Sequence, residues 1–462
     1  MKRRMDRHNQ QSISVSTVFR FLRAMVLILG IGIWAVAPQS SFAGSKTYDV
    51  RAFGAKGDGK TLDTEAIQKA LDECGNAGGG TVLFRAGTYV SEPLTLRTKT
   101  TVLLEEGAKL LATSNQAAFL KSGTDWLQAE SSSDFVPFIS GKRLTDVTIT
   151  GKGIIDGNGQ YWWPAAEEAR QKRPGYTLPR PNLIVLNYCK NVRLEKITLQ
   201  NSPKFHFVPT DSEGVVVDGV TILAPPRAAN TDAIDPSRCK NVLITKCLID
   251  VGDDNVAIKS GKKIPEREFA CEDITVSDCT FRHGHGMSIG SEVVGGVRNV
   301  TVKNCTFEGT ENGLRIKSRR GKGGKVENIA YTDITMKNVN PAILLSCSYG
   351  GTSAGDAVQV SAAKAEKSQA VTETTPIYRN IYIRNVTATA EKSAGVIEGL
   401  PESPISNVVL ENVHITSATG LKVENAKGIQ LKNTQITTKE GPPCILLENA
   451  QVEGLEKIGD KK

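Results

Sequence analysis

The stretch Asn299-Val300-Thr301-Val302 is one copy of a short pattern that recurs along most of this chain. In most copies an Asn, Asp or Gly stands before a run in which apolar residues alternate with other residues. Such alternation is typical of a β-strand with one buried face, and the residue before it suits a turn position with positive φ. Most copies are about 21 to 32 residues apart, the spacing of a repeat architecture. They begin at Asn191, Gly214, Asn241, Asp273, Asn299, Asn328, Asn380, Asn407 and Gly428.

A second position of the repeat is also apolar. The residue five places after the first apolar position is aliphatic or cysteine in every copy but the last, as Ile197, Val220, Cys247, Cys279, Cys305, Ile334, Val386, Val413 and Thr434. This predicts an inward-facing column of small side chains that includes three cysteines. Disulfides are the alternative, but the count of nine cysteines is odd and no Cys-x-x-Cys pair occurs. Cys239 lies outside this column and stays unassigned.

These patterns predict an all-β fold, a right-handed parallel β-helix, or solenoid, with one coil of short strands per repeat. Neighbouring coils are expected to stack at about 4.8 Å. A β-propeller is the alternative, but it needs repeats of about 40 residues or more. Residues 64–74 are predicted to form a short helix, with Asp63 as its N-cap and one apolar stripe. We expect this helix to cap the open N-terminal end of the coil.

The N-terminus has the pattern of an export signal. Basic residues precede an apolar run over residues 24–37, and Ser41-Phe42-Ala43 then offers a cleavage site with small residues. We therefore expect a signal peptide over residues 1–43 and a single parallel β-helix domain over residues 44–462, secreted or periplasmic. An uncleaved anchor is the alternative, although the apolar run is short for a spanning helix.

The chain of 462 residues has a formal net charge of +8. This excess is compatible with nucleic acid, a membrane surface or an acidic polysaccharide as partner, and also with an ordinary basic surface. The repeat interval roughly doubles between Asn328 and Asn380, where residues 350–375 are rich in Ala, Ser, Lys and Gly. This insertion is predicted to be either mobile or a loop that walls a groove.

Ionisable residues gather in four short clusters at intervals of roughly one repeat. They are Asn230-Thr231-Asp232, Gly252-Asp253-Asp254, Gly284-His285-Gly286 and Arg315-Ile316-Lys317. In a solenoid these clusters stack on neighbouring coils of one wall. Three carboxylates, an imidazole and two cations then share one groove, a set that suits acid/base cleavage of an anionic sugar chain.

A further strand of each repeat is predicted to carry these groups. Its apolar centres are taken to be Ile234, Ile258, Ile289, Ile316 and Leu344. Alignment on these centres places Asn230, Asp254, His285 and Asn312 in one column. Ala233, Ala257, Ser288 and Arg315 then fall in an outward column, with Asp235, Lys259, Gly290 and Lys317 in the next. The same alignment turns Asp232 toward the interior, which fits poorly with catalysis unless the turn before its strand differs.

Each cluster alone also has a plainer interpretation. Gly252-Asp253-Asp254 suits a turn or a calcium site, and His285 suits a turn histidine bonded to a carbonyl. Arg315 and Lys317 suit a solvated basic edge, which Arg319, Arg320, Lys322 and Lys325 would extend. Beside three carboxylates, two cations suit a substrate that carries carboxylates itself. No metal site is predicted.

In this order, the four clusters resemble the signature segments of glycoside hydrolase family 28, the polygalacturonase family. Phe53-Gly54-Ala55-Lys56-Gly57-Asp58-Gly59 resembles the usual opening of the bacterial members, and Ile155-Asp156-Gly157-Asn158-Gly159 followed by Trp162-Trp163 also fits. The likeness covers most of the mature chain. It implies a right-handed parallel β-helix that hydrolyses α-1,4-linked galacturonan in pectin with inversion and without a cofactor.

The resemblance also implies a role for each matching residue. Asp253 is then the general acid that protonates the leaving oxygen, while Asp232 and Asp254 hold and activate the attacking water. His285 supports the proton state of the acid.

Four further residues are implied as substrate contacts. Arg315 and Lys317 grip a galacturonate carboxylate, and Asn230 and Tyr349 belong to the same binding groove. The residues before the tyrosine, Ser346-Cys347-Ser348, depart from the usual pattern of the family.

Other functions stay open at this point. They are a rhamnogalacturonan-type hydrolase of the same family, a pectate lyase-like β-helix with calcium and an arginine base, and a binding or structural β-helix. The expected partner is an acidic polysaccharide, with no nucleic acid, no membrane after signal cleavage, and a monomeric enzyme. The sequence does not decide between endo and exo action.

Overall fold

The computed structural model describes residues 46–121, 126–129, 131–173, 176–262, 270–350 and 367–458. The expected signal peptide over residues 1–43 and most of the insertion over residues 350–375 lie outside these described residues. Lys46–Lys462 form one compact unit, mostly β and built from long parallel sheets. Among the described residues, no helix is long and apolar enough to cross a membrane.

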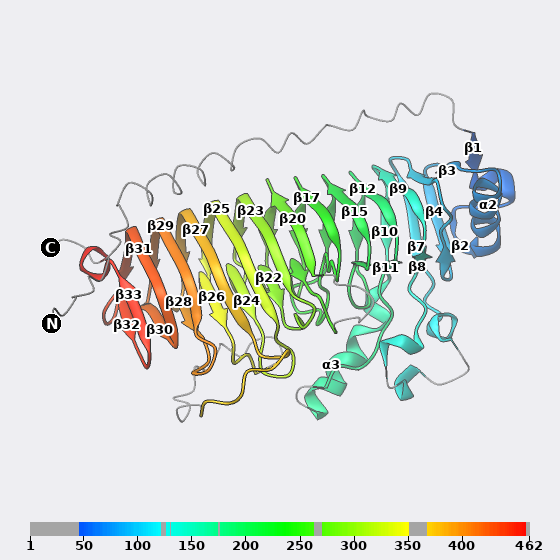
Figure 1. The fold of residues 1–462 in the computed structure, drawn as a ribbon. Helices are drawn as coiled ribbons and strands as arrows, with labels where there is room; N and C mark the ends of the chain where they lie inside the picture. The colour runs from blue at the N-terminus through cyan, green and yellow to red at the C-terminus, as the bar shows by residue number, and fades with distance from the viewer. Residues whose placement is uncertain are drawn as a thin grey trace, which may run out of the picture. The chain divides into compact units, whose positions relative to one another are not determined.

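Stacked strands form the body of this unit (Figure 1). The first sheet has 22 strands, which are β1 (Thr47–Asp49), β2 (Asp58–Leu62), β3 (Gly80–Phe84), β4 (Gly87–Ser91), β6 (Thr100–Leu104), β7 (Ala108–Ala112), β9 (Thr145–Gly151), β10 (Ile154–Asp156), β12 (Lys190–Glu195), β13 (Thr198–Gln200), β15 (Glu213–Asp218), β16 (Thr221–Leu223), β17 (Lys240–Thr245), β18 (Leu248–Asp250), β20 (Cys271–Ser277), β21 (Thr280–Arg282), β23 (Val297–Glu308), β25 (Lys325–Val339), β27 (Ile377–Ala390), β29 (Ile405–Ser417), β31 (Ala426–Thr438) and β33 (Ala450–Glu453).

Two smaller sheets form the wall that carries the four clusters. One contains β5 (Leu94–Thr95), β8 (Ile139–Lys142), β11 (Ile184–Asn187) and β14 (Phe207–Thr210). The other contains β19 (Val256–Ile258), β22 (Met287–Gly290), β24 (Leu314–Lys317), β26 (Ile343–Ser346), β28 (Ser393–Glu398), β30 (Thr419–Glu424) and β32 (Cys444–Leu446). Ile234 bridges to Phe207 of the first and to Val256 of the second, so one continuous parallel wall results. The chain is therefore a parallel β-helix.

Helices are few among the described residues. They are α2 (Thr64–Asn76), α3 (Trp163–Lys172) and the short 3-10 turns η1 (Val50–Phe53), η2 (Gln116–Phe119), η3 (Trp126–Gln128), η4 (Ser132–Asp134), η5 (Gly159–Tyr161) and η6 (Leu455–Lys457). Helix α2 lies beside β1 to β4 (Figure 1) and buries Ile67, Ala70 and Leu71. Asp63 precedes it but makes no side-chain capping bond to the helix. Its carboxylate accepts from the backbone N–H groups of Lys56 and Gly57 instead.

The predicted inward column is confirmed by burial. Cys247, Cys279 and Cys305 are each at most 2% exposed, and Cys305 pairs with Ile334 on the next strand. None of the nine cysteines forms a disulfide. Cys239, which the sequence left unassigned, lies in a second buried stack, where its N–H approaches the sulfur of Cys271 at 3.3 Å. Small side chains suit these buried positions because they pack between one coil and the next.

The turn residue before each strand has positive φ, as predicted. Asn299, Asn328, Asn380 and Asn407 all lie near +57°. Their side chains also form a ladder, because the amides of Asn328, Asn380 and Asn407 each donate to the side-chain oxygen of the preceding Asn at 3.1 to 3.2 Å. A left-handed conformation is costly for most residues, but Asn tolerates it and here adds a bond between coils.

The predicted alignment of the site strands is wrong at two places. Ile234 lies opposite Val256, not Ile258, so the first strand is shifted by two residues. Ile316 pairs with Leu345, not Leu344. The first error arises because Pro236 occupies the position opposite Ile258 and hides its apolar signal. The shift places Asp232, rather than Asn230, opposite Asp254.

Candidate active site

Four polar residues lie opposite one another on successive strands of the site wall. The register between Ile234, Val256, Met287 and Leu314 places Asp232, Asp254, His285 and Asn312 in one column. Each of these four precedes its strand by two residues, at the end of the turn that enters the wall. Neighbouring strands are about 4.8 Å apart, so the corrected register brings Asp232 into the groove with the other predicted groups.

Asp254 is held by two cations and a hydroxyl. Its Oδ2 lies 2.8 Å from Lys317 Nζ, and its Oδ1 lies 3.5 Å from Arg315 Nη2. Ser288 Oγ donates to the same Oδ1 at 2.8 Å. Burial would raise the pKa of Asp254, but the charges of Lys317 and Arg315 outweigh it and lower that pKa to about 2. Asp254 is therefore an anion at neutral and mildly acidic pH.

Asp253 lies against His285. The distance from Asp253 Oδ1 to His285 Nδ1 is 3.0 Å, and His285 Nε2 lies 3.1 Å from an oxygen of Glu311. Neither ring nitrogen makes a well-directed hydrogen bond, so these contacts are charge pairs first. Burial would lower the pKa of His285, but Asp253 and Glu311 raise it to about 10.

The carboxylate of Asp253 is also bound by backbone groups. The N–H groups of Asn230 and Asp254 donate to it at 3.2 and 2.8 Å. Burial would raise its pKa, but the positive charges of His285 and Lys317 bring that pKa below its usual value. Asp253 and His285 therefore form an ion pair that shares one proton.

Asp232 differs from both neighbours. It is 4% exposed, and among the described residues it forms an ion pair with Lys259, whose Nζ lies 3.2 Å from Oδ2. Its other oxygen, Oδ1, has no hydrogen-bond partner among the described residues. Burial and the charges of Asp235 and Asp253 raise the pKa of Asp232 well above its usual value. Of the three aspartates of the groove, Asp232 therefore binds a proton most readily.

Asn230 is fixed by a buried arginine. Arg180, which is 1% exposed, donates through Nη2 to Asn230 Oδ1 at 3.2 Å and to the carbonyl of Ala229 at 2.9 Å. Its Nε donates to the carbonyl of Pro203 at 2.8 Å. Arg180 thereby holds the turn that delivers Asp232, and the backbone N–H of Asn230 in turn binds Asp253.

Tyr349 lies where the sequence places it, beside the two cations. Its ring centroid is 5.7 Å from the guanidinium carbon of Arg315 and 5.3 Å from Lys317 Nζ. Its backbone N–H donates to the carbonyl of Ser318 at 2.9 Å. The predicted wider basic patch is reduced, because Arg320 pairs with Glu402 at 2.7 Å and Lys322 with Glu292 at 2.9 Å.

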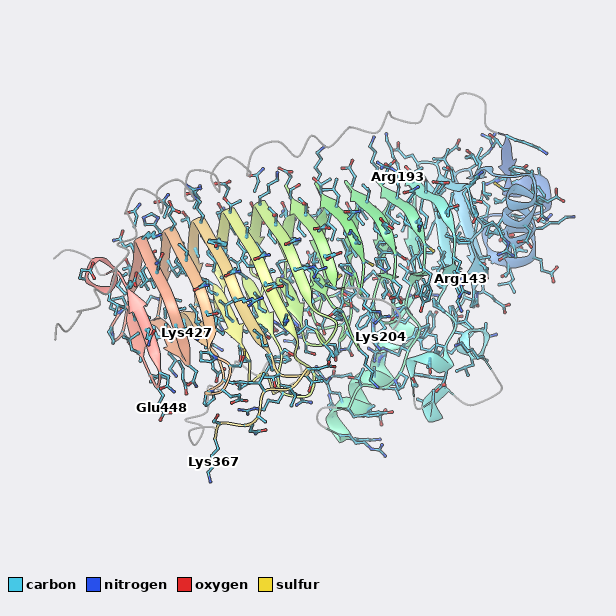
Figure 2. All side chains as sticks on the ribbon, in the orientation of Figure 1. Arg143, Arg193, Lys204, Lys367, Lys427 and Glu448 are labelled. Atoms are coloured by element: carbon cyan, nitrogen blue, oxygen red, sulfur yellow. The ribbon has the colours of Figure 1, made fainter. Side chains whose placement is uncertain are left out.

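A cleft of about 730 Å³ opens beside these groups. Trp163 and Arg170 of α3 and Arg227 of the turn after β16 line it. Gly252 and Glu311 line the part next to Asp253 and His285. Figure 2 shows Lys204 on the side of the coil where α3 lies. An extended ligand at the carboxylates therefore has room to continue toward α3.

Asp253, Asp254 and His285 have donor atoms within 4.8 Å of one another, close enough to hold a metal ion. Lys317, Arg315 and a protonated imidazole already neutralise these carboxylates. A calcium ion would have to compete with these fixed charges, so the arrangement favours acid/base chemistry over metal binding.

Sequence reasoning missed several groups of this site. They are Arg180, Asp235, Lys259, Ser288 and Glu311. The predicted alignment already placed Asp235, Ser288 and Lys259 in outward columns but gave them no role. In the observed register Asp235, Ser288 and Arg315 share one outward column, and Lys259 and Lys317 share the next. Arg180 gave no signal, since it comes from an extended segment outside the repeat.

Known proteins resemble the chain over most of its length. Residues 98–438 match the model of the family described as "Glycosyl hydrolases family 28". An endo-polygalacturonase of Pectobacterium carotovorum subsp. carotovorum is 34% identical over 87% of this chain and 97% of its own. The solved polygalacturonase of Erwinia carotovora ssp. carotovora is 32% identical, with a TM-score of 0.66 over 85% and 94% of the two chains. A Yersinia enterocolitica family 28 exopolygalacturonase, 22% identical with a TM-score of 0.74 over 90% and 80%, shares the fold.

Proposed function

The chain belongs to glycosyl hydrolases family 28, and from that premise we propose that it hydrolyses the α-1,4 linkages of polygalacturonate. The observation that carries the proposal is the convergence of the four clusters. Asp232 and Asp254 lie opposite each other on neighbouring strands, with the Asp253–His285 pair beside them and Arg315 and Lys317 within reach.

In the proposed reaction, Asp253 protonates the glycosidic oxygen as its bond to the anomeric carbon breaks. Water attacks that carbon from the opposite face and gives up a proton to Asp232 or Asp254. A general acid must be protonated and a general base ionised, so the two carboxyl groups need different pKa values. The different charged neighbours of the three aspartates supply this difference. The product has inverted configuration, as expected when a water stands between carboxyl groups.

Asp253 needs a proton that it lacks in the free protein. Lys317 is one cause of its low pKa, and Lys317 is also the proposed ligand of the substrate carboxylate. A bound galacturonate neutralises that ammonium, which weakens the pull on Asp253 and lets its pKa rise. His285, 3.0 Å away and protonated, supplies the proton. Binding of an anionic substrate would thus promote protonation of the acid that cleaves it.

Substrate recognition follows from the same cations. Arg315 and Lys317 are buried, at 4% and 6% exposure, and face Tyr349, so a sugar ring at the tyrosine would place its carboxylate between them. Asn230 lies next to the acid, because its backbone N–H donates to Asp253 at 3.2 Å. The sugar chain would then continue into the cleft lined by Trp163 and Arg227.

We also propose that the coil is right-handed, that α2 caps its N-terminal end, and that the mature chain is exported as a monomer after cleavage behind Ala43. The apolar run over residues 24–37 and its cleavage site support export. N-terminal sequencing of the secreted protein should begin at Gly44, and an intact Met1 on the exported chain would contradict this.

The test of the function is hydrolysis of de-esterified polygalacturonate by the purified chain. Asp253→Asn and Asp232→Asn should each lower kcat by about 10²- to 10⁴-fold, the range lost with a general acid or base, while the thermal midpoint stays close to that of the wild type. Reducing-sugar release and circular dichroism measure the two quantities.

Asp211→Asn is the matched control, because Asp211 is also buried and paired with a cation, Arg238, but lies outside the groove. It should retain kcat. Near-normal turnover in either site variant would refute the assigned roles, and unsaturated products would indicate a lyase instead.

A further inference from the structure

A second carboxylate, that of Asp235, competes with Asp232 for the cation Lys259. Lys259 Nζ lies 2.6 Å from Asp235 Oδ2 and 3.2 Å from Asp232 Oδ2. The side chains of Asp235 and Asp232 are 2% and 5% exposed, and that of Lys259 is 18% exposed. Lys259 also lies over the ring of Phe205, 4.5 Å from its centroid, which fixes the position of its ammonium group.

One ammonium group cannot fully compensate two buried carboxylates. Oδ1 of Asp232 and Oδ1 of Asp235 both lack a hydrogen-bond partner among the described residues. Like charges at such range prevent both groups from ionising together, so the pair holds one proton between them. Burial raises the pKa of Asp235 to about 6, against the pull of Lys259. The shorter contact places Lys259 mainly with Asp235, which leaves Asp232 as the carboxyl group that binds a proton more readily.

The surroundings of Asp232 include charges from several elements. Those that face it are Lys204 before β14, Asp235 of its own strand, Asp253 and Asp254 of the turn before β19, and Lys259 after β19. Of these, Asp253 and Asp254 are already engaged by His285 and by the two cations of the groove. Lys204 Nζ also lies near the Phe205 ring, 4.7 Å from its centroid. Lys259 is therefore the cation whose position most directly sets the charge of Asp232.

We propose that Asp235 is a positioning residue that draws Lys259 away from Asp232 and so sets the pH above which Asp232 can accept the proton of the attacking water. This inference rests on the proposed hydrolysis and deepens it. Asp235 need not touch the substrate, because it acts through Lys259. Because Asp232 shares Lys259 with Asp235, Asp232 loses its proton at a higher pH than Asp254 on the next strand.

Two substitutions should move the acidic limb of the kcat/KM profile in opposite directions. Asp235→Asn gives Lys259 wholly to Asp232, so the limb should shift down by about one pH unit, as a carboxylate that gains a cation does. Lys259→Met removes the cation, and the limb should shift up by a similar amount. Lys259→Arg keeps the charge and should restore the wild-type profile.

Asp211→Asn again provides the matched control, because the exposures of the Asp211–Arg238 pair equal those of Asp235–Lys259, at 2% and 18%. It should lower the thermal midpoint and leave the limb unchanged. Unmoved limbs in both Asp235→Asn and Lys259→Met, or limbs that move in the same direction, would overturn the inference.

A second readout separates this inference from the proposed function. Carboxyl ¹³C titration of aspartate-labelled protein, with the Asp232 signal identified by its loss in Asp232→Asn, should show the same opposite shifts without any substrate. If the wild type fails to cleave polygalacturonate while these shifts occur, only the proposed function is refuted. If it cleaves and the Asp232 signal titrates alike in all variants, only the role of Asp235 is refuted.

Discussion

His285 carries its charge between two carboxylates, and its burial makes that charge matter for stability as well as for catalysis. The imidazole contacts Asp253 on one nitrogen and Glu311 on the other. Its pKa rises to about 10 in the folded chain, against about 6.5 in an unfolded one. The folded state therefore holds a proton that the unfolded state loses at neutral pH.

This difference predicts a pH-dependent cost for His285→Gln. Because the folded pKa is the higher one, the stabilisation is fully present below pH 6.5 and is lost as pH rises through about 10. Asp253, whose folded pKa is lowered, contributes only above its unfolded pKa of about 3.9. The gap in thermal midpoint between wild type and His285→Gln should be widest between about pH 4 and 6.5 and should shrink toward pH 10. A gap that is constant from pH 5 to pH 10 would contradict this.

At this scale the sequence predicted the identity of the acidic residues better than their placement. Asp253, Asp254, His285, Arg315 and Lys317 meet where the repeat places them. Asp232 did not, because Pro236 stands where the pattern expects an apolar residue opposite Ile258, so the predicted register was two residues out. Ion pairs that cross strands, such as Lys259 with two aspartates, are visible only in the correct register.

The turns before the strands restrict which residues can occupy them. Asn380 has φ of 57°, donates to Asn328 at 3.1 Å and accepts from Asn407 at 3.2 Å. The residue thus does two things, tolerating a left-handed backbone and linking coils. Repeating Asn before each strand was readable from sequence, but the hydrogen-bonded ladder was not, because it needs the side chains to stack.

Asn380→Ala separates the two contributions. Alanine gains no side-chain bond and pays the cost of the left-handed backbone, about 1–2 kcal/mol, whereas Asn380→Gly loses the bonds but keeps the backbone freedom. Chemical denaturation should therefore rank the free energy of unfolding as wild type above Asn380→Gly above Asn380→Ala. Equal losses in the two variants would show that the side-chain bonds alone matter.

At the scale of the whole molecule, the interior is closed along its length. Eight of the nine cysteines are buried, and Cys444 is half-buried. The repeat predicted which of them face inward, because Cys247, Cys279 and Cys305 share a column with aliphatic residues. It could not predict the second stack, because Cys239 lies just before β17 and Cys271 is the first residue of β20, ahead of the alternating run.

Thiol titration tests this picture of the interior. In the native chain a thiol reagent should react with no more than Cys444, and after unfolding it should react with all nine cysteines. Treatment with a reductant should leave the thermal midpoint unchanged, because no disulfide supports the coil. Fewer than nine reactive thiols after unfolding without reductant would reveal a disulfide and contradict this.

The turn that delivers Asp232 differs in length from its neighbour. Residues 224–231 connect Leu223 to Asp232, whereas residues 251–253 alone connect Asp250 to Asp254, although both ends of the two connections are in register. The strands thus act as a fixed ruler against which loops of any length are read. Insertions or deletions in such loops can therefore change which ligands enter the groove, while the reacting carboxylates stay in the same positions.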